Sequence, residues 1–354
     1  MKTVNKYFPK SKKISIDRFI TNVLYDKKYG YYSKKIPFGK KGDFVTAPEI
    51  SFLFSEMLAL WVISLWEHLG KPKIFNIVEL GPGNGKMNST LIGVFKKFPA
   101  FFNSINIFLY EKSSNLKKLQ KKILFGEKVK WIRNFDNIKN GPIIFLGNEF
   151  FDAIPIKQYK KINNILYEKY VKLEENLKVK TFLKKTNLKT KKKLEEFSLF
   201  KNQSFIEFPK QGFKELDSII SSIKRLTGGL LLIDYGFLKL KNIDTLQSVK
   251  NHQKNLLFDN IGSADITSLV NFSLLKTYFK KKNIKTKNVV TQEFFLKKIG
   301  IINRAEILCK RMNFKEKSEM YYSLQRILNP KQMGELFKVI FAFKFKKKFS
   351  LGFI

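Results

Sequence analysis

The ten residues from Ile77 to Lys86, IVELGPGNGK, constrain the fold of this chain more than any other stretch. A short apolar run that ends at turn residues is typical of a strand buried in a parallel sheet. Three glycines then follow between positions 81 and 85, and glycine lets a backbone approach a ligand closely. The stretch therefore predicts a strand that ends in a ligand-binding loop at the carboxyl edge of a sheet.

Two common glycine-rich loops do not match this spacing. A P-loop needs Gly-x-x-x-x-Gly-Lys-Ser/Thr, but Leu80 stands at the first glycine and Met87 at the final hydroxyl. A dinucleotide fingerprint places its third glycine three residues after the second, whereas Gly85 comes after two. What remains is Glu-x-Gly-x-Gly-x-Gly, the spacing of class I S-adenosylmethionine-dependent methyltransferases. In that interpretation Glu79 faces the ammonium group of the cofactor.

A second sign lies one strand later, in NIFLYEK, residues 106–112. A carboxylate at the end of a second strand can accept hydrogen bonds from both hydroxyls of a ribose, and Glu111 has that position. Alone, Glu111 would be read as an ordinary carboxylate at a strand end. After the third strand, Asn134 and Phe135 occupy the place where an adenine would lie, although an aromatic residue there could equally belong to the core.

The third sign is GNEFFDAIP, residues 147–155, at the end of a fourth strand. Open α/β sheets present catalytic groups at this edge. Asn148, Glu149 and Asp152 bring an amide and two carboxylates together, which suits a cationic methyl acceptor, and a guanidinium in particular. One of these polar residues could instead serve only as a helix N-cap.

After Pro72, strands alternate with helices, and this alternation predicts an open, doubly wound α/β sheet. Its expected strands are residues 74–80, 105–111, 129–133, 142–147 and 230–235, with a final one at 338–345.

Four other segments complete the expected organisation, in which residues 1–70 form an N-terminal helical cap and lid and residues 71–354 a methyltransferase domain. Helical spacing predicts helices at 15–25 and about 51–69. Polar and apolar residues alternate within 156–208, which predicts an inserted antiparallel β segment. A substrate-side insertion at about 262–330 is expected to be helical, with one helix near 267–280 and a strand near 287–291.

The net charge of +39 could serve a nucleic-acid partner. The charge is mostly lysine, however, in a chain that is also rich in Phe, Ile and Asn, and base composition accounts for that combination without any partner. The loop after the fourth strand also lacks the Asp/Asn-Pro-Pro-aromatic motif that holds a flipped base.

Other classes of protein are disfavoured by what the sequence contains. The longest apolar stretch, 53–66, is shorter than a membrane span needs and includes Glu56, so no span is expected. The basic N-terminus does not read as a secretory signal. The single cysteine, Cys309, and the absence of Cys/His clusters indicate a reducing compartment and no metal site.

Long motifs in a fixed order resemble one family, the MidA-type methyltransferases, over nearly the whole chain. This family includes a mitochondrial protein arginine methyltransferase required for assembly of respiratory complex I. The motifs are LYDKKYGYY (24–32), FGKKGDFVTAPEIS (38–51), VELGPGNGKM (78–87), NEFFDAIPIKQ (148–158), LLIDYG (231–236), DTLQSVKNH (244–252), ADITSLVNF (264–272) and KQMGELFKVI (331–340).

The resemblance implies a class I methyltransferase fold and roles for particular residues. Cofactor contacts would come from Glu79, Gly81, Gly83, Gly85, Glu111, Asn134, Phe135 and Asn148. Asp43, Glu149 and Asp152 would form an acidic, catalytic pocket for an arginine side chain. The lid and a second wall would bring Thr46, Pro48, Glu49, Thr245, His252, Asp265 and Thr267 to the substrate side, with His252 as readily a structural histidine.

The resulting expectation is a methyltransferase that uses S-adenosyl-L-methionine to methylate a protein arginine, with a quinone-module subunit of complex I as the first substrate to consider. Two alternatives stay open: a nucleic-acid methyltransferase, and a non-catalytic assembly factor that binds the cofactor. A bacterial cytoplasmic location is expected, and the mitochondrial matrix only for an organellar member.

Overall fold

The computed structural model describes residues 4–35, 37–39, 42–200, 203–239 and 241–354. The chain divides into two compact units, each assembled from three separate segments. Unit 1 comprises Met1–Phe44, Phe151–Asp217 and Leu238–Tyr278, and unit 2 comprises Val45–Phe150, Ser218–Phe237 and Phe279–Ile354. The expected boundary near residue 70 separates a lid from a catalytic domain by function, and it stays a prediction.

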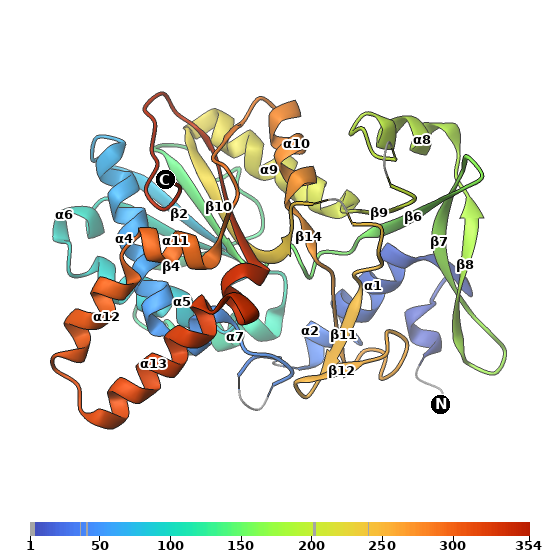
Figure 1. Ribbon diagram of the computed structural model, residues 1–354, viewed down its shortest axis with the longest axis horizontal. Coiled ribbons are helices and arrows are strands. Elements are labelled where there is room, and N and C mark those ends of the chain that lie inside the picture. The colour runs from blue at the N-terminus through green and yellow to red at the C-terminus, as the bar shows by residue number, and fades with distance from the viewer. Residues whose placement is uncertain (1–3, 36, 40–41, 201–202, 240) are drawn as a thin grey trace. The chain divides into compact units, whose positions relative to one another are not determined.

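Unit 2 is built on a sheet whose main path runs β15-β17-β10-β5-β2-β3-β4 (Figure 1). From β10 to β4 neighbouring strands are parallel, whereas β17 is antiparallel to β10 and to β15. The strands are β15 (Lys285–Thr286), β17 (Phe337–Lys344), β10 (Gly228–Phe237), β5 (Ile143–Asn148), β2 (Phe75–Leu80), β3 (Ile105–Tyr110) and β4 (Val129–Ile132). The predicted parallel strands and the final strand are confirmed.

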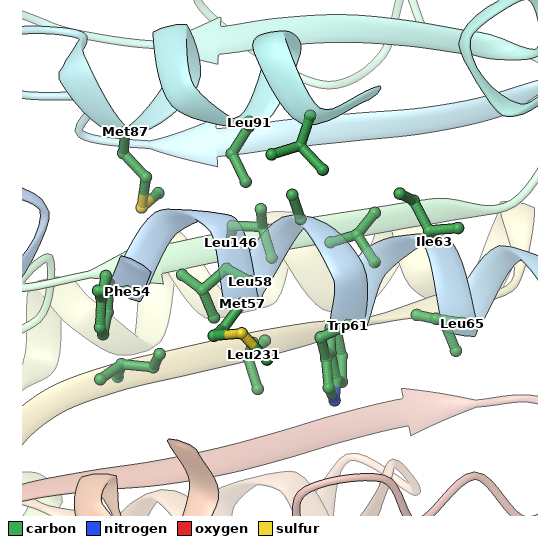
Figure 2. Packing of buried hydrophobic residues seen from close by; sticks show 14 of the residues in the cluster. Phe54, Met57, Leu58, Trp61, Ile63, Leu65, Met87, Leu91, Leu146 and Leu231 are labelled. Carbon is green, nitrogen blue, oxygen red and sulfur yellow. The ribbon is translucent and has the colours of Figure 1, made fainter. Parts of the chain in front are cut away.

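Helix α4 (Phe52–His68) is apolar over most of its surface, and such a helix is buried on more than one side. Figure 2 shows α4 between Met87 and Leu91 of α5 (Lys86–Phe95) on one side and Leu231 of β10 on the other. Trp61 is fully buried, and its ring meets that of Phe341 in β17 edge-on, with 5.0 Å between centroids. The predicted helix at 51–69 is confirmed as a central element of this core.

The remaining helices that contribute to unit 2 are α3 (Ala47–Ile50), α6 (Pro99–Phe102), α7 (Ser114–Ile123), the second half of α9 (Lys210–Leu226), α11 (Gln292–Lys298), α12 (Ile301–Cys309), α13 (Phe314–Leu328) and the π-helical turn η2 (Pro330–Gly334). A further two-residue strand, β16 (Val290–Thr291), pairs with β17. Helix α7 begins after Ser113, whose hydroxyl accepts a hydrogen bond from the Leu116 N–H at 3.3 Å, as an N-cap should.

Unit 1 contains the predicted antiparallel insertion. Its larger sheet has the order β1-β7-β6-β9 with β8 beside β7, all antiparallel. These strands are β1 (Lys13–Ser15), β6 (Lys157–Ile162), β7 (Ile165–Leu173), β8 (Val179–Lys185) and β9 (Phe205–Phe208). A smaller sheet, β12-β11-β13, comprises β11 (Gln247–Lys250), β12 (Gln253–Asn255) and β13 (Asp265–Thr267).

The helices of unit 1 include α1 (Ile16–Tyr25), whose apolar face forms a core with β7. Phe19, Ile20 and Val23 of α1 are buried with Val171 of β7, so the predicted helix at 15–25 is confirmed. The short helices are η1 (Asn5–Tyr7), α1 (Ile16–Tyr25), α2 (Tyr31–Lys34) and α8 (Leu188–Glu195).

The segment expected to be helical at 262–330 is only partly so. Strands β13, β14 (Val270–Asn271), β15 and β16 interrupt it, and the helix expected near 267–280 begins later, as α10 (Phe272–Lys281). The reason is tertiary: residues 265–267 pair with β11, and that pairing overrides the local helical pattern. The strand expected near 287–291 is reduced to the two residues of β16, after β15.

Among the described residues, no helix is both long enough and apolar enough to cross a membrane. The same part of the chain contains no group of three or more His, Cys, Asp or Glu side chains arranged to hold a metal ion.

Candidate active site

The glycine-rich loop follows β2 directly and leads into α5. Gly81, Gly83 and Gly85 have φ values of +60°, +56° and +88°, in the left-handed region that side chains other than glycine rarely adopt. The Gly81 N–H donates to the Tyr110 carbonyl at 2.9 Å, which ties the loop to the end of β3. A Cβ atom at Gly81 would come within 3.1 Å of the Phe150 ring. The loop therefore keeps a bare backbone at the sheet edge, which fits close approach by a cofactor.

Glu79 lies in β2, buried with 3% of its surface exposed. Burial raises the pKa of Glu79 to about 8, against the opposing effect of a hydrogen bond donated by the Asn88 amide; the nearby Glu111 charge raises it further. A buried carboxyl of this kind favours a cationic partner, and the ammonium end of the expected cofactor has that charge. Asn88, on α5, is a site neighbour that the sequence did not indicate.

Glu111 follows β3 and is also buried. One carboxylate oxygen accepts the Ser113 N–H at 2.7 Å, and the other accepts the Gln120 amide at 3.1 Å. Burial raises the pKa of Glu111, while these two donors oppose the rise. The carboxylate is thus held in one orientation at the strand end, where the sequence placed a ribose-binding group.

Asn134 and Phe135 lie beyond β4 in different surroundings. Asn134 is exposed, whereas the Phe135 ring is 3% exposed and packs between Tyr110 and Phe145, with centroids 5.1 and 4.9 Å away. These contacts are those of a core residue, the alternative that the sequence left open. Contact of either residue with an adenine stays a prediction.

Asn148 ends β5 and Glu149 follows it, both within unit 2. Glu149 has φ +50°, and its N–H donates to the Ile233 carbonyl of β10 at 2.9 Å. One Glu149 carboxylate oxygen accepts the Asn148 amide at 3.1 Å and the Ala47 N–H at 3.3 Å. The Asn148 Oδ1 atom is buried and has no hydrogen-bond partner among the described residues. A left-handed non-glycine residue at a strand end often marks a functional position.

The expected lid residues Thr46 and Glu49 lie at the one-turn helix α3. Glu49 accepts the Thr46 N–H at 3.3 Å with one carboxylate oxygen and the Asn84 side-chain amide at 2.8 Å with the other. Asn84 belongs to the glycine-rich loop, so α3 is hydrogen-bonded to that loop directly.

In unit 1, Asp43 is fully buried, and its carboxylate accepts four hydrogen bonds. The donors are the Tyr31 hydroxyl at 2.5 Å, the Lys35 ammonium at 2.7 and 2.8 Å, and the Asn251 N–H at 2.7 Å. Burial alone would raise the pKa of Asp43, but these donors, Asn251 first, lower it overall. The expected role for Asp43 was catalytic, whereas this geometry favours a carboxylate that stays ionised and holds structure.

Asp152 and Asp265, also in unit 1, are both buried. Asp265 accepts the Tyr32 hydroxyl at 3.0 Å and the Ile266 N–H at 2.9 Å. Burial first, and then the charge of Asp152, raise the pKa of Asp265 to about 7. The Asp152 carbonyl accepts the Ser268 N–H at 3.0 Å. The sequence separated these carboxylates into a catalytic and a substrate-side residue, and the structure brings them into one group with Tyr32.

The other expected substrate-side residues are fixed by hydrogen bonds within unit 1. The Thr245 hydroxyl donates to Glu207 and accepts the Leu269 N–H at 3.0 Å, and Thr267 accepts the Gln247 amide at 3.2 Å. His252 is exposed, has φ +63°, and donates its N–H to the Asp43 carbonyl at 3.0 Å. The main chain of His252 thus forms part of a tight turn between β11 and β12, and a substrate role for its side chain stays a prediction.

Comparison with known proteins agrees with this geometry. A family model of S-adenosyl-L-methionine-dependent methyltransferases matches residues 57–290. Proteins named protein arginine methyltransferase NDUFAF7, mitochondrial, are 29% identical in Xenopus laevis and 30% identical in Mus musculus. Both alignments cover 92% of this chain, and they cover 80% and 79% of those proteins.

A crystal structure of a protein from Burkholderia thailandensis bound to S-adenosyl-homocysteine is similar with a TM-score of 0.81 at 21% identity. The similarity covers 96% of this chain and 90% of that chain. It shows that the predicted class I methyltransferase fold is correct. The chain therefore belongs to the MidA-type family of S-adenosyl-L-methionine-dependent methyltransferases.

Proposed function

We propose that this methyltransferase transfers the methyl group to an arginine side chain of a protein. The observation that carries the proposal is the buried group of Asp152, Asp265 and Tyr32 in unit 1. A guanidinium stays protonated near neutral pH and offers a planar fork of donors that carboxylates match. The names of the NDUFAF7 relatives, which cover most of this chain, support the same substrate class.

The cofactor would be held by residues of unit 2. The glycine-rich loop would accommodate its methionine portion, with Glu79 toward the ammonium and Glu111 toward the ribose hydroxyls. When bound, S-adenosylmethionine supplies an electrophilic sulfonium methyl group. The protein must then orient the acceptor nitrogen, exclude water and take up one proton.

Carboxylates of this chain would orient the acceptor and take up its proton. Asp152 would orient the acceptor guanidinium, and Asp265, whose pKa of about 7 suits a general base near neutral pH, would take its proton. Glu149, in unit 2, stays a predicted catalytic residue. Asp43 would act by positioning the β11–β12 turn, since its own oxygens are fully engaged.

Three finer assignments belong to the same proposal. Residues 1–70 would act as a lid, supported by the hydrogen bond from Asn84 to Glu49. The substrate protein to test first is a quinone-module subunit of complex I. The expected location is the bacterial cytoplasm.

The proposal is tested by measuring the transfer of labelled methyl groups from S-adenosylmethionine to proteins that contain arginine. Asp152→Ala should lower the rate of methyl transfer by about 100-fold or more, because a carboxylate that binds the substrate is lost. The affinity for S-adenosyl-homocysteine, measured by calorimetry, should stay unchanged. Glu175→Gln, at an exposed turn of unit 1, is the matched control and should behave as wild type.

Identification of the methylated residue by mass spectrometry decides the substrate class. Methylarginine that disappears with Asp152→Ala supports the proposal. Label confined to lysine or to RNA, or full activity in Asp152→Ala, would overturn it.

A further inference from the structure

Gln120 is the one fully buried polar side chain of α7, a helix whose other polar residues are mainly lysines. A buried amide is costly unless its donors and acceptor are satisfied. The Gln120 Oε1 atom accepts the Trp131 indole N–H at 2.9 Å, and Nε2 donates to the Gly83 carbonyl at 2.9 Å and to Glu111 at 3.1 Å. The carbonyl oxygen and the NH2 group of this amide are therefore both hydrogen-bonded.

Trp131 determines which way the amide of Gln120 points. An indole nitrogen only donates hydrogen bonds, so the oxygen of Gln120 must face Trp131, and the NH2 group must face the opposite side. On that side lie two acceptors from different elements: a carbonyl of the glycine-rich loop after β2 and the carboxylate that follows β3. One side chain thus connects the two elements of unit 2 that are assigned to the cofactor.

We infer that Gln120, oriented by Trp131, is a positioning residue of the cofactor site, which fixes the glycine-rich loop and Glu111 in the mutual geometry that a sulfur nucleoside requires. The inference rests on the proposed assignment of that loop and of Glu111 to the cofactor. A prearranged site loses less conformational freedom when the ligand binds. Loss of the bridge, the pair of hydrogen bonds from Gln120 to Gly83 and Glu111, should therefore lower the affinity for the cofactor more than it lowers the stability of the fold.

Close packing supports this position. A Cβ atom at Gly85 would lie 3.5 Å from Cγ of Gln120, so the side chain is in van der Waals reach of the loop as well as bonded to it. Replacement of Gln120 by Met conserves length and approximate volume but removes both donors and the acceptor.

The experiment measures the Kd for S-adenosyl-homocysteine by calorimetry in the full chain. Gln120→Met should weaken binding about 10- to 100-fold. Trp131→Phe should weaken it less, and the double variant should bind like Gln120→Met alone, because Trp131 acts through Gln120. In the ligand-free protein, the ¹⁵N–¹H signal of the Trp131 indole should shift in Gln120→Met, which reports the bridge without any ligand.

Gln292→Met is the matched control. Gln292 is equally buried in unit 2, at the start of α11, and its amide donates to the Ile327 carbonyl at 2.9 Å. This variant should lose thermal stability but keep the wild-type Kd. Equal Kd changes in Gln120→Met and Gln292→Met, or an unchanged Kd in Gln120→Met, would overturn the inference. If Gln120→Met does not fold, an unchanged Kd in Trp131→Phe would overturn the inference.

Glu111→Gln separates this inference from the site assignment beneath it. If Glu111→Gln and Gly83→Val leave the Kd unchanged, the cofactor assignment is wrong and the inference fails with it. If both weaken binding while Gln120→Met does not, the site is correct and only the positioning role is lost.

Discussion

The side-chain carboxylate of Asp43 accepts hydrogen bonds from the Tyr31 hydroxyl, the Lys35 ammonium and the Asn251 main-chain N–H. The main-chain carbonyl of Asp43 accepts the main-chain N–H of His252. Two of the donors, Asn251 and His252, are adjacent residues with positive φ in the turn between β11 and β12. Asp43 thus holds the left-handed backbone of this turn in place.

Asp43→Asn should therefore destabilise unit 1, because an amide has one acceptor oxygen and places NH2 against another donor. We expect a loss of roughly 1–3 kcal/mol in the free energy of unfolding, measured by urea denaturation. Conversely, the pH profile of methyl transfer should keep its shape. A variant as stable as wild type whose profile loses its acidic limb would show that Asp43 takes the proton.

The sequence alone predicts some features of these residues and not others. The positions of the glycines and Glu111 directly after β2 and β3 could be predicted, because their spacing relative to the strands is local information. Gln120 could not, because in SNLKKLQKKI it resembles a solvent-exposed residue. Its burial depends on where α7 packs, and its orientation depends on Trp131. Asp43 and Asp265 stay predicted site residues. The sequence does not show that the Asp43 carboxylate is saturated with donors, nor that burial and the charge of Asp152 raise the pKa of Asp265 to about 7.

At the scale of elements, strand identity was predictable wherever both faces of a strand are buried. The largely apolar runs of β2, β5 and β10 indicate buried strands from the local sequence alone. Residues 265–271 show the opposite case, because short strands that pair with distant partners have little local pattern. The same holds for β1, which the sequence did not indicate and which pairs with β7.

Helix α3 is only one turn long, so its persistence depends on its contacts. Glu49→Ala removes the acceptor of both the Thr46 N–H and the Asn84 amide. We expect roughly 5- to 30-fold faster hydrogen exchange at the amides of 46–51, equivalent to about 1–2 kcal/mol of local stability. Mass spectrometry of the exchanged peptides measures this change.

Two variants control that measurement. Glu49→Gln keeps one acceptor oxygen and should give an intermediate rate. Glu67→Ala removes an exposed carboxylate on α4 that pairs with Lys71 and should leave residues 46–51 unaffected. Wild-type exchange in Glu49→Ala would mean that other contacts hold α3 and that the lid proposal lacks this support.

For the whole molecule, two buried carboxyls link stability to pH. Burial, first among the causes, raises the pKa of Glu79 to about 8 and that of Asp265 to about 7. The folded protein therefore keeps two protons that the unfolded chain releases near pH 4 to 4.5. Their contribution to stability is complete below that range and is lost as the pH rises through about 7 and 8.

The melting temperature of the cofactor-free protein should accordingly fall by several degrees between pH 5.5 and 8.5, for a loss of up to roughly 5 kcal/mol. The combined variant Glu79→Gln and Asp265→Asn should show a flatter profile, whereas Glu175→Gln should follow wild type. A melting temperature that stays level or rises over this range in the wild type would contradict the prediction.

The chain passes from one compact unit to the other five times, after residues 44, 150, 217, 237 and 278. Neither unit is therefore a continuous stretch of the gene. A single recombination event could neither have delivered one unit to the other nor exchange it now for a unit of different specificity. Change in substrate preference within such a lineage has to come through substitutions and loop insertions inside a chain that is inherited whole.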